Sequence, residues 1–216
     1  MYVKDRKLLT DFMLGMRQIN LLEDKILAKQ LDLSTTRSIL DIGGGAGDWS
    51  ILLLEHANAN CSVDIYERSD AIPVLLDIFK QNANENAQRK ISYVGGSFLE
   101  DVNGEYLINI SGNKVYDLIS LGWILHDWND DTCTMILRKA YSHLAPDGCL
   151  IILEAIMPDD KVSEIALSDI TMLLHTEGKE RSFAEYKKIL QRSGFISENI
   201  SWTETSTRRQ IISATK

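Results

Sequence analysis

The chain has 216 residues, of which 44% are hydrophobic and 25% are charged, which is enough for one domain with a substantial buried core. Its formal net charge of −8 argues against a nucleic-acid-binding protein, because such proteins need a basic face to displace the counterions of phosphates. No apolar run approaches the ~18 residues of a membrane span, and the N-terminus has no apolar core of signal length. We therefore expect a cytoplasmic protein that contacts neither nucleic acid nor membrane.

The three cysteines, Cys61, Cys133 and Cys149, show no paired spacing. All three fall in apolar strand or helix patterns. We therefore expect buried thiols, with no disulfide and no zinc site.

Apolar residues at spacings of three and four predict an amphipathic helix over residues 5–30. Strand and helix patterns then alternate, which predicts a parallel α/β sheet of at least five strands. The expected strands are 37–42, 61–67, 90–95, 115–125 and 149–156, and the expected helices are 47–57, 72–83, 130–144, 165–175 and 182–194. The last two extended runs, 196–205 and 208–216, are joined by a short polar turn and should pair antiparallel.

A glycine turn follows the first expected strand, where Gly43, Gly45 and Gly47 form a G-x-G-x-G pattern. A dinucleotide fingerprint would need a glycine where Asp48 stands. Glycines let backbone N–H groups approach a ligand closely, and a helix N-terminus favours a carboxylate as readily as a phosphate. Glu67 ends the second strand, where an acidic side chain can accept both hydroxyls of a ribose. A nucleoside with an amino-acid tail, S-adenosylmethionine, fits both features; alternatively the glycines only form a tight turn and Glu67 is a solvated strand end.

Six segments resemble the motifs of the S-adenosylmethionine-dependent O-methyltransferases of the plant caffeate and animal hydroxyindole type, together with their bacterial relatives. They are "LDIGGGAGDW", "YERSDAI", "VGGSF", "LGWILHDWNDD", "CLIILEAIMPDD" and "EGKERSFAEYKKILQRSGF". The resemblance runs from about residue 12 to the C-terminus. It implies a Rossmann-like class I methyltransferase domain over residues 31–216: a mostly parallel seven-stranded sheet with an antiparallel C-terminal strand and helices on both faces. Residues 1–30 would form an N-terminal helical lid or linker.

The resemblance also implies the residues that bind S-adenosyl-L-methionine. They are Asp41, Gly43, Gly45, Gly47, Glu67, Arg68, Ser97, Phe98, Gly122, Trp123 and Trp128. Ser97 and Phe98 stand where the family has an Asp-Met pair that flanks adenine, and Gly122 stands where its lysine reaches the cofactor. The family's N-terminal dimerisation domain, of roughly a hundred residues, has no counterpart here. We therefore expect a monomer or a weak homodimer, with the acceptor pocket open or capped by residues 1–30 alone.

His126 follows the fourth expected strand, at the carboxyl edge of the sheet where open α/β folds bind ligands. An imidazole that titrates near neutrality can take the proton of a phenol or an enol. Glu154 and Glu180 match the two family acids that orient and polarise this histidine. The sequence thus predicts methylation of a hydroxyl of a small aromatic or enolic metabolite; alternatively His126 is a helix-entry residue bonded to backbone.

Apolar and polar side chains near these segments could line an acceptor pocket, although side chains at helical spacing are more often ordinary core. The candidates are Phe12, Met13, Met16, Trp123, Asp127 and Met172.

The acidic run "HDWNDD" offers hard oxygen ligands at Asp127, Asp130 and Asp131. Helix capping by Asn129 or Asp130 explains this run better, so we expect no metal. Two other functions stay open at this point: N- or C-methylation of a small molecule, and a non-methylating scaffold that binds S-adenosylmethionine.

Overall fold

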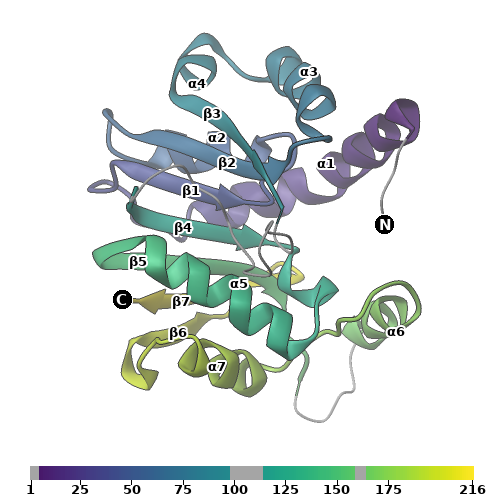
Figure 1. Ribbon diagram of the computed structural model, residues 1–216, viewed down its shortest axis with the longest axis vertical. Helices are drawn as coiled ribbons and strands as arrows, with labels where there is room; N and C mark the ends of the chain where they lie inside the picture. The colour runs from purple at the N-terminus through teal and green to yellow at the C-terminus, as the bar shows by residue number, and fades with distance from the viewer. Residues whose placement is uncertain (1–4, 98–113, 159–163) are drawn as a thin grey trace. The chain divides into compact units, whose positions relative to one another are not determined.

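The structure is a computed structural model and describes residues 5–97, 114–158 and 164–216 (Figure 1). Contacts between residues divide the chain into two compact units, Met1–Gly112 and Asn113–Lys216, which we call unit 1 and unit 2. Each unit is described by itself.

The sheet of unit 1 consists of β1 (Ser38–Ile42), β2 (Ser62–Arg68) and β3 (Ile91–Gly96) in the order β3-β2-β1. Both strand pairs are parallel, as the alternating strand and helix pattern predicts. Glu67 pairs in register with Gly95 near the carboxyl ends of β2 and β3. The loops that follow β1 and β2 therefore leave the sheet at the same edge.

The described residues of unit 1 form the helices α1 (Arg6–Ala28), α2 (Asp48–His56), α3 (Ile72–Asn82) and α4 (Glu85–Lys90). Helix α1 packs against α2 and α3. The short α4 was not expected, because its residues are polar and show no apolar period. Its N-terminus is fixed by Asn84, whose side chain accepts a hydrogen bond from the Ala87 N–H.

The sheet of unit 2 has the order β4-β5-β7-β6, with β4 (Tyr116–Gly122), β5 (Leu144–Ala155), β6 (Ile200–Thr203) and β7 (Arg209–Thr215). Strands β4 and β5 are parallel, whereas β7 runs antiparallel to both β5 and β6. The predicted antiparallel pairing of the last two segments is therefore confirmed.

Strand β5 begins earlier than predicted, because the Pro-Asp-Gly segment lies inside it as a bulge. Asp147 has a φ of 62°, and the register with β4 shifts between the pairs Tyr116–Leu144 and Leu118–Cys149.

The helical segments of unit 2 are η1 (Leu125–Asp127), α5 (Asp130–His143), α6 (Ile165–His175), α7 (Phe183–Arg192) and η2 (Ser197–Asn199). Helix α5 packs against β5 and α7, and α7 also packs against β6. A capping box between Ser182 and Glu185 fixes the start of α7.

Strand β4 is shorter than the predicted strand 115–125, and this difference places the site. The strand ends at Gly122, and Trp123 has a φ of 56°, which bulky residues rarely adopt. The N–H groups of Ile124 and Leu125 donate to the buried carboxylate of Glu154 instead of continuing the strand ladder. The chain therefore turns into η1 and leaves His126 beyond the end of β4.

The expected fold class is confirmed: the described part of the chain is mixed α/β, with seven strands that are parallel except where β7 meets its neighbours. Cys61 and Cys133 are buried free thiols as predicted, and Cys149 is also free but only half-buried. None of the helices in the described residues combines the length and the apolar character that a membrane crossing requires.

Candidate active site

The three expected catalytic side chains of unit 2 lie together. His126 lies in η1 and is only 8% exposed. Its Nδ1 lies 3.3 Å from Oε1 of Glu180 and 3.9 Å from Oε2 of Glu154. The other ring nitrogen, Nε2, lies 3.7 Å from Oδ1 of Asp127. One edge of the imidazole therefore faces two carboxylates and the opposite edge faces away from them.

Glu154, near the end of β5, has two structural contacts besides His126. Its Oε1 accepts hydrogen bonds from the N–H groups of Ile124, at 3.0 Å, and Leu125, at 2.8 Å. Complete burial raises the pKa of Glu154, while the neighbouring His126 and these two N–H donors oppose that rise. The same carboxylate therefore shapes the turn after β4 and faces the histidine on that turn.

Glu180 is held by two adjacent polar residues of α6. Its Oε1 accepts a hydrogen bond from the Ser168 hydroxyl at 2.6 Å, and its backbone N–H donates to Oδ1 of Asp169 at 2.9 Å. The sequence analysis missed these two residues. The available signal was a polar pair inside the otherwise apolar segment "IALSDITMLLH".

The charge state of His126 requires a correction. Burial by itself would lower the pKa of this imidazole, but the carboxylates of Glu154 and Glu180 outweigh burial and raise the pKa from 6.5 to about 9. The expectation that His126 titrates near neutrality is therefore wrong. At neutral pH the resting side chain is an imidazolium.

The indole ring of Trp123 lies beside the histidine. The ring of Trp123 lies 4.9 Å from the His126 ring at an angle of 38°. The guanidinium carbon of Arg208 lies 4.6 Å from the centroid of the Trp123 ring, and that of Arg209 lies 5.6 Å from it. The loop between β6 and β7 thus reaches the indole that contacts His126, which the sequence analysis did not expect.

The other candidates of unit 2 are less enclosed. Asp127, Trp128 and Met172 are each half-buried, and Gly122 ends β4. A Cβ added at Gly122 would meet Leu153 at an ordinary 3.7 Å, so this position has room for a side chain.

The acidic run after His126 is explained by helix capping and ion pairs. Asn129 caps α5 by accepting a hydrogen bond from the Thr132 N–H, as predicted. Asp130 pairs with Arg181 at 2.8 Å, and Asp131 pairs with Arg192 at 2.6 Å.

Atoms of His126, Glu154 and Glu180 that can bind a metal ion lie within 4.8 Å of one another. The hydrogen bond between His126 Nδ1 and Glu180 Oε1 already accounts for this proximity. The expectation that the site works without a metal stays a prediction.

The glycine turn of unit 1 has the backbone that its residues predict. Gly43, Gly45 and Gly47 have φ values of 71°, 56° and 84°, all in the left-handed region. The Gly45 N–H donates to Oε1 of Glu67 at 3.1 Å, and the Gly45 carbonyl accepts a hydrogen bond from Tyr93 at 2.9 Å. Glu67 is only 8% exposed, so it is not a solvated strand end.

The space around each glycine shows which side of the loop is open. A Cβ at Gly44 would lie 2.5 Å from Oδ2 of Asp41, and one at Gly47 would lie 2.9 Å from Phe79. Among the described residues, a Cβ at Gly45 would meet only the Met13 sulfur, at 3.9 Å. Gly45 therefore borders open space on the side where a ligand could approach.

Asp41 supports this loop from the buried side. Its Oδ2 accepts a hydrogen bond from the Ser50 hydroxyl of α2 at 2.6 Å. Burial raises the pKa of Asp41 to about 7, and the Ser50 hydrogen bond opposes that rise.

The remaining candidates of unit 1 are distributed around the loop. Arg68 pairs with Asp70, and the Ser97 carbonyl accepts a hydrogen bond from Tyr66 at 3.1 Å. Met16 is half-buried on α1, whereas Phe12 is 54% exposed. Phe98 lies outside the described residues.

A cavity of about 480 Å³ lies elsewhere in unit 2, at the ends of β5 and β6. Its lining includes Met157, Phe183, Trp202 and Arg208, but none of the three buried groups around His126. We therefore place the candidate chemistry at the His126 cluster and not in this cavity.

Comparison with known proteins gives the family. The O-methyltransferase domain family matches residues 1–196. The chain is 30% identical over 186 residues to acetylserotonin O-methyltransferase of Gallus gallus, which covers 85% of this chain and 49% of that protein. The chain thus spans about half the length of the curated relatives it matches.

Solved structures agree on the fold. A structure of PigF with SAH is 27% identical, with a TM-score of 0.84 over 99% of this chain and 60% of that one. Human N-acetylserotonin methyltransferase in complex with SAM is 23% identical, with a TM-score of 0.82 over 99% of this chain and 57% of that one. Because the family match covers most of its residues, the chain belongs to the O-methyltransferase domain family.

Proposed function

We propose that this protein transfers a methyl group from S-adenosyl-L-methionine to a hydroxyl of a small aromatic or enolic metabolite, with His126 as the general base. The observation that supports the proposal is the buried imidazole whose Nδ1 faces the carboxylates of Glu154 and Glu180. With Nδ1 engaged, Nε2 is the atom that can accept the proton of the acceptor.

The residues of unit 1 fit the cofactor. The open space at Gly45 admits a ligand close to the backbone, and the buried Glu67 carboxylate is suited to hydroxyl groups of a ribose. Asp48 would repel a carboxylate at the start of α2, but Arg17 pairs with it at 2.8 Å and offsets that charge. The bound cofactor supplies an electrophilic methyl group, and the chain's task is to hold the acceptor in line with it and remove its proton.

The raised pKa of His126 suits a weakly acidic hydroxyl. A neutral imidazole with a conjugate-acid pKa of about 9 takes a proton from a phenol, of pKa about 10, in a nearly balanced step. The cost is that only about 1% of the histidine is neutral at pH 7 when the pKa is about 9. The match between these two pKa values supports a phenol or enol as acceptor over an aliphatic alcohol, which is a much weaker acid.

Residues around the histidine supply an apolar wall for such an acceptor. Trp123 stacks beside His126, and Met172 lies half-buried on α6. Asp127 in unit 2 and Phe12, Met13 and Met16 in unit 1 are the further residues that we propose as acceptor contacts. We also propose that the protein acts in the cytoplasm as a monomer or weak homodimer, without nucleic-acid or membrane partners.

The test of this proposal separates binding from rate. His126→Ala should leave the affinity for S-adenosylmethionine nearly intact, measured by calorimetry, while turnover of the acceptor falls roughly 10²- to 10⁴-fold. Raising the pH should partly rescue this variant, because the acceptor then ionises in solution.

His143→Ala is the matched control, because His143 ends α5 and its Nδ1 contacts only the Lys114 carbonyl among the described residues. It should retain full turnover. If His126→Ala keeps wild-type turnover between pH 6 and 9, His126 is not the base.

A further inference from the structure

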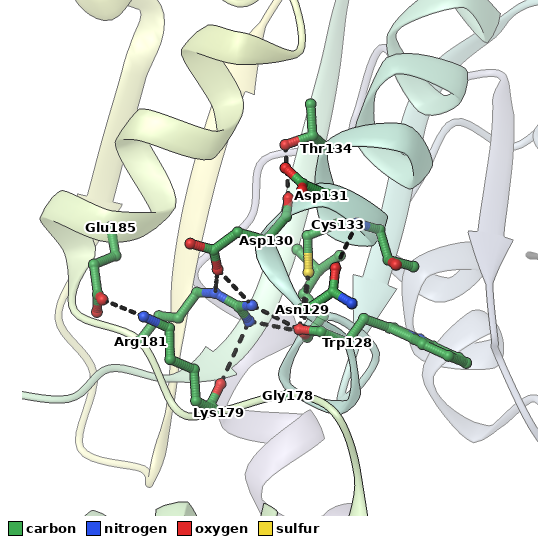
Figure 2. A network of polar contacts seen from close by, with 12 residues as sticks. Trp128, Asn129, Asp130, Asp131, Cys133, Thr134, Gly178, Lys179, Arg181 and Glu185 are labelled. Carbon is green, nitrogen blue, oxygen red and sulfur yellow. Dashed lines mark hydrogen bonds and ion pairs between the residues drawn. The ribbon is translucent and has the colours of Figure 1, made fainter. Parts of the chain in front are cut away.

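Arg181 immediately follows Glu180, and its side chain is completely buried. Figure 2 shows its guanidinium beside Trp128 and Asp130, which follow His126 in the chain. Its Nη1 donates to the Leu125 carbonyl at 2.8 Å, and its Nη2 donates to the Trp128 carbonyl at 2.6 Å. Its Nε donates to Oδ1 of Asp130 at 2.9 Å. The planar guanidinium therefore fixes three acceptors that lie on both sides of His126 along the chain.

The backbone of Arg181 reaches the third member of the cluster. Its carbonyl accepts a hydrogen bond from the Met157 N–H at 2.9 Å, and Arg181 forms a parallel bridge with Ile156. This bridge lies just beyond β5, two residues after Glu154. One residue thus connects the segments that carry His126, Glu154 and Glu180.

The segment that leads to Arg181 also contacts the backbone of His126, at Gly178. A Cβ added at Gly178 would lie 1.9 Å from the His126 carbonyl oxygen and 2.6 Å from the Trp128 nitrogen. The Cys133 thiol adds a contact to the Leu125 carbonyl at 3.2 Å. The chain on both sides of the imidazole is therefore held from several directions, and Arg181 provides the largest share of the polar contacts.

We propose that Arg181 is a positioning residue, which holds the imidazole of His126 against the carboxylates of Glu154 and Glu180. The proposal rests on the proposed function only in naming His126 as the base. Removing the guanidinium would take the charged donor from the Leu125 and Trp128 carbonyls and from Asp130, and would leave the two carbonyls only the weaker Cys133 thiol and, at Leu125, the Trp128 N–H, so the loop would rearrange. A shift of about 1 Å in a reacting group can cost 10²-fold in rate.

Because of the charges around His126, the proposal can be tested by whether the pKa of His126 rises or falls when Arg181 is replaced. Asp127 on η1, Glu154 on β5 and Glu180 before α7 favour the imidazolium. A positive charge works in the opposite direction, and the cations on the neighbouring elements are Arg181 and, above Trp123, Arg208 and Arg209. Cys133 on α5 stays neutral, because burial raises the pKa of its thiol to about 12. If Arg181 acted only through its charge, removing it would raise the pKa of His126; if it acts by position, removing it lowers that pKa.

The experiment is an NMR titration of His126 in the full chain labelled with ¹⁵N-histidine, and it needs no acceptor. Arg181→Met and Arg181→Lys should both lower the pKa of His126 from about 9 toward 6.5, by roughly one unit or more. Lysine keeps the charge but cannot contact three acceptors in one plane. A rise with Met and no change with Lys would show a charge effect only. An unchanged pKa in both variants, with only a lower melting temperature, would show a merely structural role.

The matched control is Arg192→Met, which removes the 2.6 Å ion pair to Asp131 and so also weakens a contact between α7 and α5. It does not touch the His126 loop, and the pKa of His126 should not change. If Arg181→Met fails to fold, Asp130→Asn provides the second variant: it weakens the Arg181 contact and should lower the pKa of His126 by less. An unchanged pKa in Asp130→Asn together with Arg181→Lys would overturn the proposal.

Turnover gives the second measurement. Arg181→Lys should lower kcat by roughly 10²-fold, leave the KM for S-adenosylmethionine unchanged, and move the pH–rate inflection by the same amount as the NMR pKa. A protein that transfers no methyl group would refute the proposed function but leave the NMR prediction standing, so the two failures can be told apart.

Discussion

At the scale of single residues, the buried cluster determines how often the proposed base, His126, is neutral. The carboxylates of Glu154 and Glu180 that hold the ring in place also stabilise its protonated form. The residue is therefore well oriented, and a strong base once neutral, but it is neutral only in a small fraction of molecules at pH 7.

This charge state predicts the pH dependence of the reaction. In the proposed mechanism only the neutral imidazole takes the proton. Because the pKa of His126 is raised to about 9, kcat/KM should increase from pH 7 and level off above about pH 9. The measurement needs an acceptor that does not itself ionise over this range. A profile that is flat from pH 7 to pH 9 would contradict the raised pKa or the role of His126.

Replacing one carboxylate should move this profile in a known direction. Glu180→Gln removes a negative charge 3.3 Å from Nδ1, so the pKa of His126 falls and the inflection shifts to lower pH. Turnover should fall by less than in His126→Ala, because the proposed proton acceptor, His126, remains. Glu177→Gln, on an exposed side chain of the same loop, should leave the inflection where it is; an equal shift in both variants would argue against a specific contact.

A chelator tests the expectation that no metal takes part. Extensive dialysis against EDTA should leave turnover and the pKa of His126 unchanged, because the imidazole already bonds to Glu180. Loss of activity that returns with one added divalent ion would mean that the three side chains act as ligands.

At the scale of elements, a substitution in the glycine turn between β1 and α2 should affect cofactor binding much more than folding. Gly45→Val places its side chain in open space beside the Met13 sulfur, so the fold should survive apart from about 1–2 kcal/mol for a left-handed β-branched residue. The same side chain should block the cofactor. Calorimetry should therefore show loss of S-adenosylmethionine binding in a variant that still melts cooperatively.

Gly15→Ala is the control for this measurement, because outside the backbone of α1 no atom of the described residues lies within 4 Å of a Cβ at this position. It should bind the cofactor normally and gain about 1 kcal/mol of helix stability. Unchanged cofactor affinity in Gly45→Val would place the binding site elsewhere.

Most elements follow from periodicity, and the exceptions have local causes. The apolar periods of α1 and α6 and the capping box of α7 can be read from the residues. Helix α4 could not, because six polar-rich residues form it through a cap at Asn84 and not through an apolar face. The end of β4 could not either: "LGWIL" has high strand propensity, but a carboxylate from β5 takes the N–H groups that would continue the strand.

The site was predictable as a set of residues but not as an arrangement. His126, Glu154 and Glu180 are distant in sequence, and only the resemblance to the family motifs grouped them. The raised pKa of His126 depends on distances that no pattern encodes. The burial of Arg181 could not be predicted either, because an arginine in the polar segment "GKERS" is expected to be solvated, and only the folded loop shows that it is buried.

At the scale of the whole molecule, the outer face of α1 bears on assembly. Leu8, Phe12, Ile19, Leu22 and Ile26 are each 40% or more exposed and recur at spacings of three, four and seven. Such a stripe is the pattern of a helix that meets another helix. In an antiparallel pair of two α1 helices, Leu8 would lie opposite Ile26 and Phe12 opposite Leu22, with Asp11 near Lys25 of the second copy.

This stripe is the surface through which we propose that a weak homodimer forms. Leu22→Glu should convert any dimer to monomers, measured by sedimentation velocity at two protein concentrations, because it places a charge in the centre of the stripe. Lys188→Glu, on an exposed residue of α7, should not. A tight, salt-insensitive dimer that survives deletion of residues 1–20 would show that another surface is responsible.

The close contact between Gly178 and the His126 backbone also limits which positions of this O-methyltransferase domain can be redesigned. Any side chain at position 178 would collide with the backbone of His126, so most variants in a random library that includes this position would be misfolded. Glu177 has an exposed side chain and can be varied freely on steric grounds. Directed evolution toward new acceptors should therefore diversify Met172 and the neighbouring surface of α6, and leave the glycine as it is.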